Sequence, residues 1–96
     1  MYDFNDLIFE PREDRMSGFA AELHFKNGYG VSVICGERYY CSPRINLSDA
    51  LMYDEYEVGV LKDGSLTTDT PYGEEVLGYR SKSDVTMIMD KLQSLT

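Results

Sequence analysis

An enzyme needs nucleophiles, acids and bases or metal ligands held in one site, and this 96-residue sequence offers few of them. It has one histidine, His24, and two cysteines, Cys35 and Cys41, that are separated by five residues. Two cysteines and one histidine cannot supply the usual four ligands of a zinc site within one chain. The sequence also lacks a phosphate-binding loop, a dinucleotide fingerprint and a nucleophile elbow. We therefore predict no catalytic residues, no metal and no cofactor, in a protein that is not an enzyme.

Carboxylates and tyrosines gather in a segment that has no basic residue between Arg44 and Lys62. Tyrosines interleaved with carboxylates can pack against a partner protein and present negative charge to its basic surface. Such a surface can also occupy a groove built for nucleic acid, because its carboxylates imitate the charge of phosphates. The alternative interpretation is a solvated face that only keeps the protein soluble. The residues predicted to bind a partner are Asp49, Tyr53, Asp54, Glu55, Tyr56 and Glu57.

A second candidate binding site combines stacking rings with guanidinium groups in one short segment, formed by Arg38, Tyr39, Tyr40 and Arg44. Guanidinium groups bind phosphate through paired hydrogen bonds, and they also stack on aromatic faces. If the acidic segment is not the binding surface, this cluster is the alternative ligand-binding site, and a small signalling nucleotide is its expected ligand.

The clearest structural pattern is an alternation of apolar and polar residues over residues 19–35, interrupted by the turn-forming pair Asn27-Gly28. A two-residue loop would set Leu23 opposite Ser32, which mixes the faces. A three-residue loop, with Gly28 in the left-handed region, instead pairs Leu23 with Val31 and gives one apolar face. His24 then lies on the polar face, which favours a plain surface histidine over a general base.

A second hairpin is predicted over residues 56–70, with a three-residue loop at residues 62–64 that pairs Val60 with Leu66. Its second strand is rich in threonine, which is typical of a strand near a sheet edge. An earlier strand is expected over residues 6–10, ending before Pro11. Residues 38–55 are expected to form a long loop that holds a short helix at residues 47–52, and residues 71–78 one helical turn.

The C-terminal segment changes to a helical period. Its apolar stripe consists of Val85, Ile88, Met89, Leu92 and Leu95. Ser81 and Asp84 resemble a capping box, so the helix is predicted over residues 82–94. The fold class follows: one α+β domain spanning residues 1–96, with an antiparallel sheet of two hairpins plus an N-terminal strand. The C-terminal helix packs on one face of this sheet, because no other surface is large enough to cover its stripe.

Three segments, residues 6–11, 27–34 and 69–79 with the helix that follows, resemble small uncharacterised acidic proteins encoded by bacteriophages. The order of these segments matches, and together they cover about half of the chain. The resemblance implies a phage or prophage accessory protein in the cytoplasm of an infected bacterium. It supplies no activity and no functional residues to carry over. Residues 38–55 depart most from the pattern, so a binding specificity placed there belongs to this protein alone.

The charge balance restricts the possible partners. Seventeen acidic residues against nine basic ones give a net charge of −8, which argues against direct binding to nucleic acid. Part of this charge is a second acidic stretch, partly neutralised by Arg12 and Arg15, that contains Asp3, Asp6, Glu10, Glu13 and Asp14.

No apolar run is long enough for a membrane span, and the acidic N-terminus lacks the basic region of a signal peptide. We therefore expect a cytoplasmic protein whose two cysteines are reduced thiols, because disulfides are disfavoured there.

These observations favour a small acidic accessory protein that binds and inhibits a host protein with a basic surface. A nucleic-acid-handling defence enzyme, such as a CRISPR effector or a restriction enzyme, is the expected target, which would make the protein an anti-CRISPR or anti-restriction type of inhibitor. One alternative is a non-enzymatic homo-oligomer that sequesters a small signalling nucleotide. Another is a structural or assembly accessory protein that associates through an edge strand or its helix.

Overall fold

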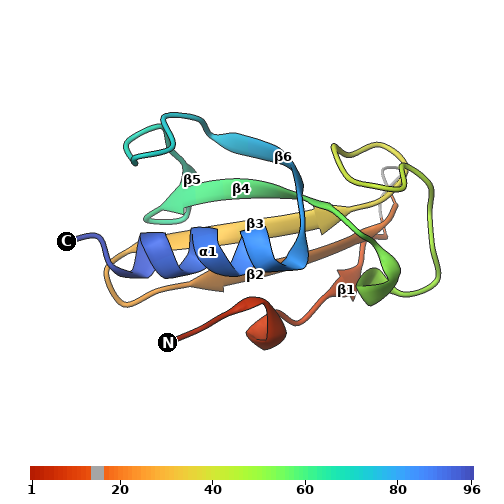
Figure 1. The fold of residues 1–96 in the computed structure, drawn as a ribbon, viewed down its shortest axis with the longest axis horizontal. Helices are drawn as coiled ribbons and strands as arrows, with labels where there is room; N and C mark the ends of the chain where they lie inside the picture. The colour runs from red at the N-terminus through yellow and green to blue at the C-terminus, as the bar shows by residue number, and fades with distance from the viewer. Residues whose placement is uncertain (14–16) are drawn as a thin grey trace.

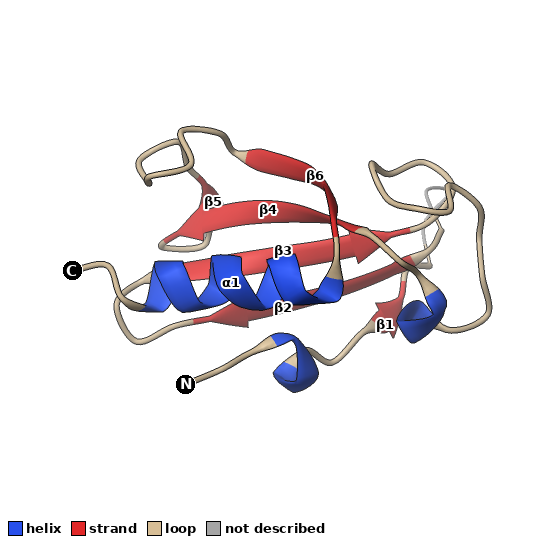
Figure 2. Cartoon of the chain, in the orientation of Figure 1, coloured by secondary structure: helices blue, strands red, loops and turns tan. Residues whose placement is uncertain are grey.

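The computed structural model describes residues 1–13 and 17–96, and it consists of an antiparallel sheet with one long helix on one face (Figure 1). Asp14 and Arg15 of the second acidic stretch lie outside the described residues. The sheet runs in the order β1-β2-β3-β4, and both β5 and β6 pair with the outer edge of β4. The strands are β1 (Glu10–Pro11), β2 (Phe19–His24), β3 (Tyr29–Cys35), β4 (Tyr56–Lys62), β5 (Ser65–Leu66) and β6 (Val76–Arg80). The helices are α1 (Lys82–Gln93) and the 3₁₀ turns η1 (Phe4–Asp6) and η2 (Ala50–Met52), as Figure 2 shows. The predicted α+β class is confirmed.

The hairpin formed by β2 and β3 has the predicted register. Leu23 pairs with Val31, and the amide of Phe25 donates to the carbonyl of Tyr29 at 2.7 Å, which closes a three-residue loop. Gly28 has a φ of +90°, as the three-residue loop requires. The apolar residues of both strands therefore face α1.

The second hairpin differs from the prediction. Leu61, not Val60, pairs with Leu66, and the loop has only two residues, Asp63 and Gly64. Both loop residues have positive φ, at +51° and +84°, which is the backbone of a type I′ turn. The chain leaves the sheet after Leu66, so the predicted strand up to residue 70 is wrong.

The segment predicted as a helical turn at residues 71–78 ends in a strand instead. In β6, Leu77 pairs with Val58 and Val76 pairs with Gly59. β4 is buried on both faces along residues 58–61, so the amides and carbonyls along its outer edge need partners within the protein. β5 supplies hydrogen-bond partners only at the end of this edge, and β6 supplies them along the rest.

The N-terminal elements are also shorter than predicted. The expected strand over residues 6–10 is only β1, in which Glu10 and Pro11 pair with Ala20 and Phe19. The residues before it form η1, whose first amides are capped by Asp3. The predicted helix at residues 47–52 is reduced to η2.

Helix α1 begins at the predicted capping box and packs on the sheet through its apolar stripe. The side chain of Ser81 accepts from the amide of Asp84, and the Asp84 side chain accepts from the amide of Ser81. The buried residues of α1 are Val85, Ile88, Met89 and Leu92, and they join the core side chains of β3, β4 and β6. The opposite face of the sheet carries no helix in the described part of the chain (Figure 1). None of the helices among residues 1–13 and 17–96 is long and apolar enough to cross a membrane.

Candidate functional site

The two tyrosines of the predicted partner-binding segment point into the protein. Tyr53 and Tyr56 have exposed fractions of 1% and 0%. The Tyr53 hydroxyl donates to the carbonyl of Ile45 at 2.7 Å and accepts from the amide of Leu47 at 2.9 Å. Burial raises the pKa of the Tyr56 phenol, which therefore stays protonated. Contrary to the prediction, neither ring lies where it could pack against a partner, because both complete the core under residues 45–52.

The side chains that this segment does present are apolar ones that the sequence analysis did not select. Leu51 and Met52 are 54% and 60% exposed, and they lie between the exposed carboxylates of Asp49 and Asp54. Asp49 caps η2, since its Oδ1 accepts from the amide of Leu51 at 2.9 Å. We call Asp49, Leu51, Met52, Asp54 and Glu55 the η2 ridge. One feature of the sequence could have indicated that these side chains are exposed. Asp49 is a helix-capping residue, and a helix of a single turn after it is too short to bury all of its apolar side chains.

The backbone of the η2 ridge is fixed at several points. The carbonyl of Leu51 accepts a hydrogen bond from Nζ of Lys82 at 2.6 Å, which ties η2 to the start of α1. At the other end of the ridge, Glu55 forms an isolated bridge with Ser42 through two backbone hydrogen bonds of 3.1 and 3.2 Å. A surface that is ordered before binding loses little conformational entropy when a partner arrives.

The carboxylates of the η2 ridge form no ion pair with a described basic side chain, although the ammonium of Lys82 reaches the backbone of the ridge at Leu51. Within residues 1–13 and 17–96, no basic side chain lies within ion-pair distance of Asp49, Asp54 or Glu55. Glu57, the last residue of the predicted site, is separated from them. It follows Tyr56 on β4, so its side chain lies on the opposite face of the sheet, where Oε1 accepts from the amide of Tyr40 at 3.0 Å.

The structure also divides the predicted ligand-binding cluster of Arg38, Tyr39, Tyr40 and Arg44. The ring of Tyr39 is buried, with the guanidinium of Arg12 5.5 Å from its centre, whereas Arg38 is exposed. Two members stay together: the guanidinium of Arg44 lies 5.5 Å from the centre of the exposed Tyr40 ring. The ring of Tyr79 lies beside Tyr40, with 6.1 Å between the ring centres.

The two cysteines are buried, and the histidine contacts a neighbouring glutamate on the surface. Cys35 and Cys41 are both buried free thiols, and burial, with a smaller contribution from Cys41, raises the pKa of Cys35 to about 12. Burial also raises the pKa of Cys41, whose Sγ donates to the carbonyl of Gly36 at 3.1 Å. His24 pairs with Glu22 on the exposed face of β2, at 2.6 Å from Nε2 to Oε2. No group of three or more metal-ligating side chains occurs among the described residues.

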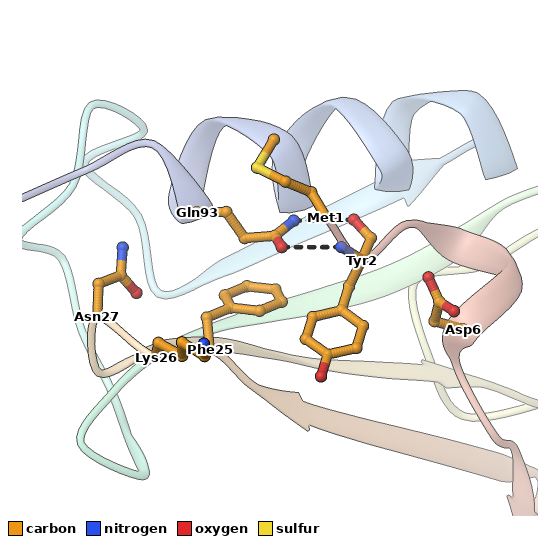
Figure 3. Close-up of a pocket in the computed structure, with 7 residues that line it drawn as sticks. All are labelled: Met1, Tyr2, Asp6, Phe25, Lys26, Asn27 and Gln93. Carbon is orange, nitrogen blue, oxygen red and sulfur yellow. Dashed lines mark hydrogen bonds between the residues drawn. The ribbon is translucent and has the colours of Figure 1, made fainter.

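A hollow of about 540 Å³ lies between the N-terminal segment, the β2–β3 loop and the end of α1 (Figure 3). Its walls are Met1, Tyr2, Asp6, Phe25, Lys26, Asn27 and Gln93. The polar atoms of two of these side chains are already engaged. Gln93 exchanges hydrogen bonds of 2.8 and 2.9 Å with the backbone of Tyr2, and Nδ2 of Asn27 donates to the carbonyls of Leu92 and Leu95 at 2.8 Å. This hollow is therefore bounded by contacts that fasten the two chain ends, and we assign it no ligand.

The chain matches no protein-family model, no curated protein and no solved structure. The proposals on function below therefore depend on the geometry and charge of the described residues and on the sequence resemblance to bacteriophage proteins.

Proposed function

We propose that this protein is a non-catalytic binding protein whose η2 ridge docks on a basic surface of a partner protein. The observation that carries this proposal is the position of Leu51 and Met52, two exposed apolar side chains between carboxylates that form no ion pair with any described basic side chain. Apolar side chains at the centre of an interface supply most of its binding energy once water is excluded. Charged residues around them supply orientation and speed of association.

The expected partner follows from the charge of the whole chain as well as that of the ridge. Because the net charge is −8, the protein accelerates its encounter with a basic surface and is repelled from free nucleic acid. Grooves that bind nucleic acid are basic, because their Lys and Arg side chains neutralise phosphate charge. We therefore propose that the η2 ridge occupies such a groove in a nucleic-acid-handling defence enzyme of a host bacterium and inhibits it, in the manner of an anti-CRISPR or anti-restriction protein. The bacteriophage resemblance supports this choice of partner.

The experiment compares three double variants with the wild type. Immobilised wild-type protein first captures its partner from a bacterial lysate at low salt, and association and dissociation rates with the purified partner are then measured. Asp54→Asn with Glu55→Gln removes two charges from the ridge, so association should slow and lose much of its salt dependence. Leu51→Ser with Met52→Ser removes the apolar contacts, so dissociation should become faster. Neither change touches a buried side chain, and the folded state should persist in both.

The matched control is Glu74→Gln with Glu75→Gln, which removes the same amount of charge from exposed positions in the loop before β6. If this control slows association as much as the change at Asp54 and Glu55, only the net charge matters and the ridge has no special role. Unchanged dissociation in the Leu51 and Met52 variant would equally contradict the proposal. Inhibition is tested separately, by adding nucleic acid to the complex: a partner whose groove is filled should release the protein as nucleic acid binds.

A further inference from the structure

The face of the sheet opposite α1 contains a shallow hollow of about 220 Å³ that the η2 ridge does not share. It runs across the central strands, where Glu22 pairs with Ser32, Ser32 with Gly59, and Gly59 with Val76. These four residues have the same orientation, because directly paired residues of neighbouring strands point to one face of a sheet. The hollow is therefore built from strands rather than from loops.

The floor of this hollow is apolar, and a glycine keeps it open. Gly59 is buried, and Leu61 beside it is only 5% exposed. A Cβ added at Gly59 would lie 3.1 Å from Cδ2 of Leu66, so a side chain at this position would fill the space. Leu66 and Val76 form an exposed apolar wall on the β5 and β6 side.

Two glutamates lie at the rim, and each is oriented through one oxygen. Oε2 of Glu22 contacts Nε2 of His24 at 2.6 Å, and Oε1 of Glu57 accepts from the amide of Tyr40 at 3.0 Å. No described residue donates to the second oxygen of either carboxylate. The rim thus offers two fixed acceptors beside an apolar floor, on the strands that flank β3.

We propose that this hollow receives an arginine side chain of a partner protein. The methylene groups of arginine would cover the apolar floor at Gly59, and its guanidinium would donate to the free oxygen of Glu22 or of Glu57. Arginine suits the rim better than lysine, because its planar group offers several donors to one carboxylate. A purely apolar occupant would bury the free oxygen of each carboxylate without a donor. A second copy of this chain, related by a two-fold axis, would bring like charges together.

This inference rests on the proposed function for the basic character of the partner, but it concerns a different face of the molecule. The experiment is a titration of the full chain with the short capped peptide acetyl-Gly-Arg-Gly-amide, followed through the backbone amide signals in NMR spectra. Saturable shifts are expected at Ser32, Gly59 and Val76. The isosteric peptide with citrulline in place of arginine has no charge, and it should leave these signals in place.

The decisive variant is Glu22→Gln with Glu57→Gln, which preserves the shape of both side chains and an acceptor for the Tyr40 amide. Loss of both negative charges should weaken binding of the peptide about tenfold, whereas the variant Glu74→Gln with Glu75→Gln should bind it as the wild type does. The inference is overturned if citrulline shifts the same signals, if the Glu22 and Glu57 variant binds equally well, or if the shifts map to the η2 ridge. The variant Leu51→Ser with Met52→Ser leaves this face intact, so it should bind the peptide as the wild type does. Failure of the η2 ridge proposal can therefore be distinguished from failure of this one.

Discussion

The hydroxyl of Tyr56 donates a hydrogen bond of 2.6 Å to the carbonyl of Ala50, the first residue of η2. Tyr56 is fully buried, and its ring packs 5.2 Å from that of Phe4. The same side chain thus fills the core and fixes the backbone that carries the exposed Leu51 and Met52. Two residues that the sequence suggested as contacts, Tyr53 and Tyr56, act instead as supports for the segment that presents the contacts.

Tyr56→Phe should lower the free energy of unfolding by about 1–2 kcal/mol, because the buried carbonyl of Ala50 loses its donor while the ring remains. Urea denaturation measures this change. Tyr40→Phe, at a side chain that is 53% exposed, is the control and should leave the midpoint where it is. Equal midpoints for wild type and Tyr56→Phe would show that the hydrogen bond does not stabilise the fold.

Leu92→Asp should unfold the protein, since a lone carboxylate would be buried between α1 and the sheet. The matched control lies on the same helix: Met87 is 67% exposed, so Met87→Asp should retain the wild-type circular dichroism spectrum and melting temperature within a few degrees. A folded Leu92→Asp variant with unchanged melting temperature would contradict the packing of α1.

Gly28→Val should destabilise the protein by about 1–2 kcal/mol, because a β-branched residue is strained at positive φ. A Cβ at this position would also lie 2.8 Å from Oδ1 of Asp63 in the neighbouring turn. Gly28→Asn should lose less, since asparagine tolerates positive φ better than valine. Chemical denaturation measures the free energy of unfolding of the two variants. If both lose the same amount, crowding against Asp63 rather than backbone strain is the cause.

The hairpin of β2 and β3 could be predicted to the residue because its alternation is local and only one of its faces is apolar. β4 offered no such guide. Val58, Gly59, Val60 and Leu61 are all buried, so a shift of one residue exposes nothing, and the loop at Asp63-Gly64 was assigned one residue too long. β6 was missed for a related reason, since its pairing with β4 depends on strands that are distant in sequence.

The sequence predicted which side chains of the segment from Asp49 to Glu57 are charged, but not which of its other side chains are exposed. Asp49, Asp54 and Glu55 are exposed or half-exposed, as charged side chains should be. The sequence could not show that Tyr53 and Tyr56 point inward, because an amphipathic side chain suits a core and an interface equally well. It also could not show that Leu51 and Met52 point outward, because this depends on η2 being a single turn.

Stability should fall as the pH rises above the ordinary thiol pKa of 9.0. Burial raises the pKa of Cys35 to about 12, so between these values the folded protein keeps a proton that the unfolded chain has lost. The unfolded state then binds fewer protons, and the free energy of unfolding decreases with pH. Urea denaturation at a series of pH values should show a shallower decrease for Cys35→Ala than for wild type. Parallel decreases would mean that Cys35 does not titrate on unfolding.

Lys82→Met should loosen η2 while leaving the global stability nearly unchanged. The exposed ammonium of Lys82 donates to the carbonyl of Leu51, and methionine keeps most of the side-chain length without a donor. Surface changes of this kind alter the free energy of unfolding by less than about 0.5 kcal/mol. The amides of Leu51 and Met52 both donate within this turn, to the side chain and the carbonyl of Asp49, so their hydrogen exchange should become faster. Lys91→Met, an exposed change near the other end of α1, is the control and should leave the exchange of these two amides as in wild type. Equal exchange rates in the Lys82 and Lys91 variants would mean that the tie between α1 and η2 does not order the ridge.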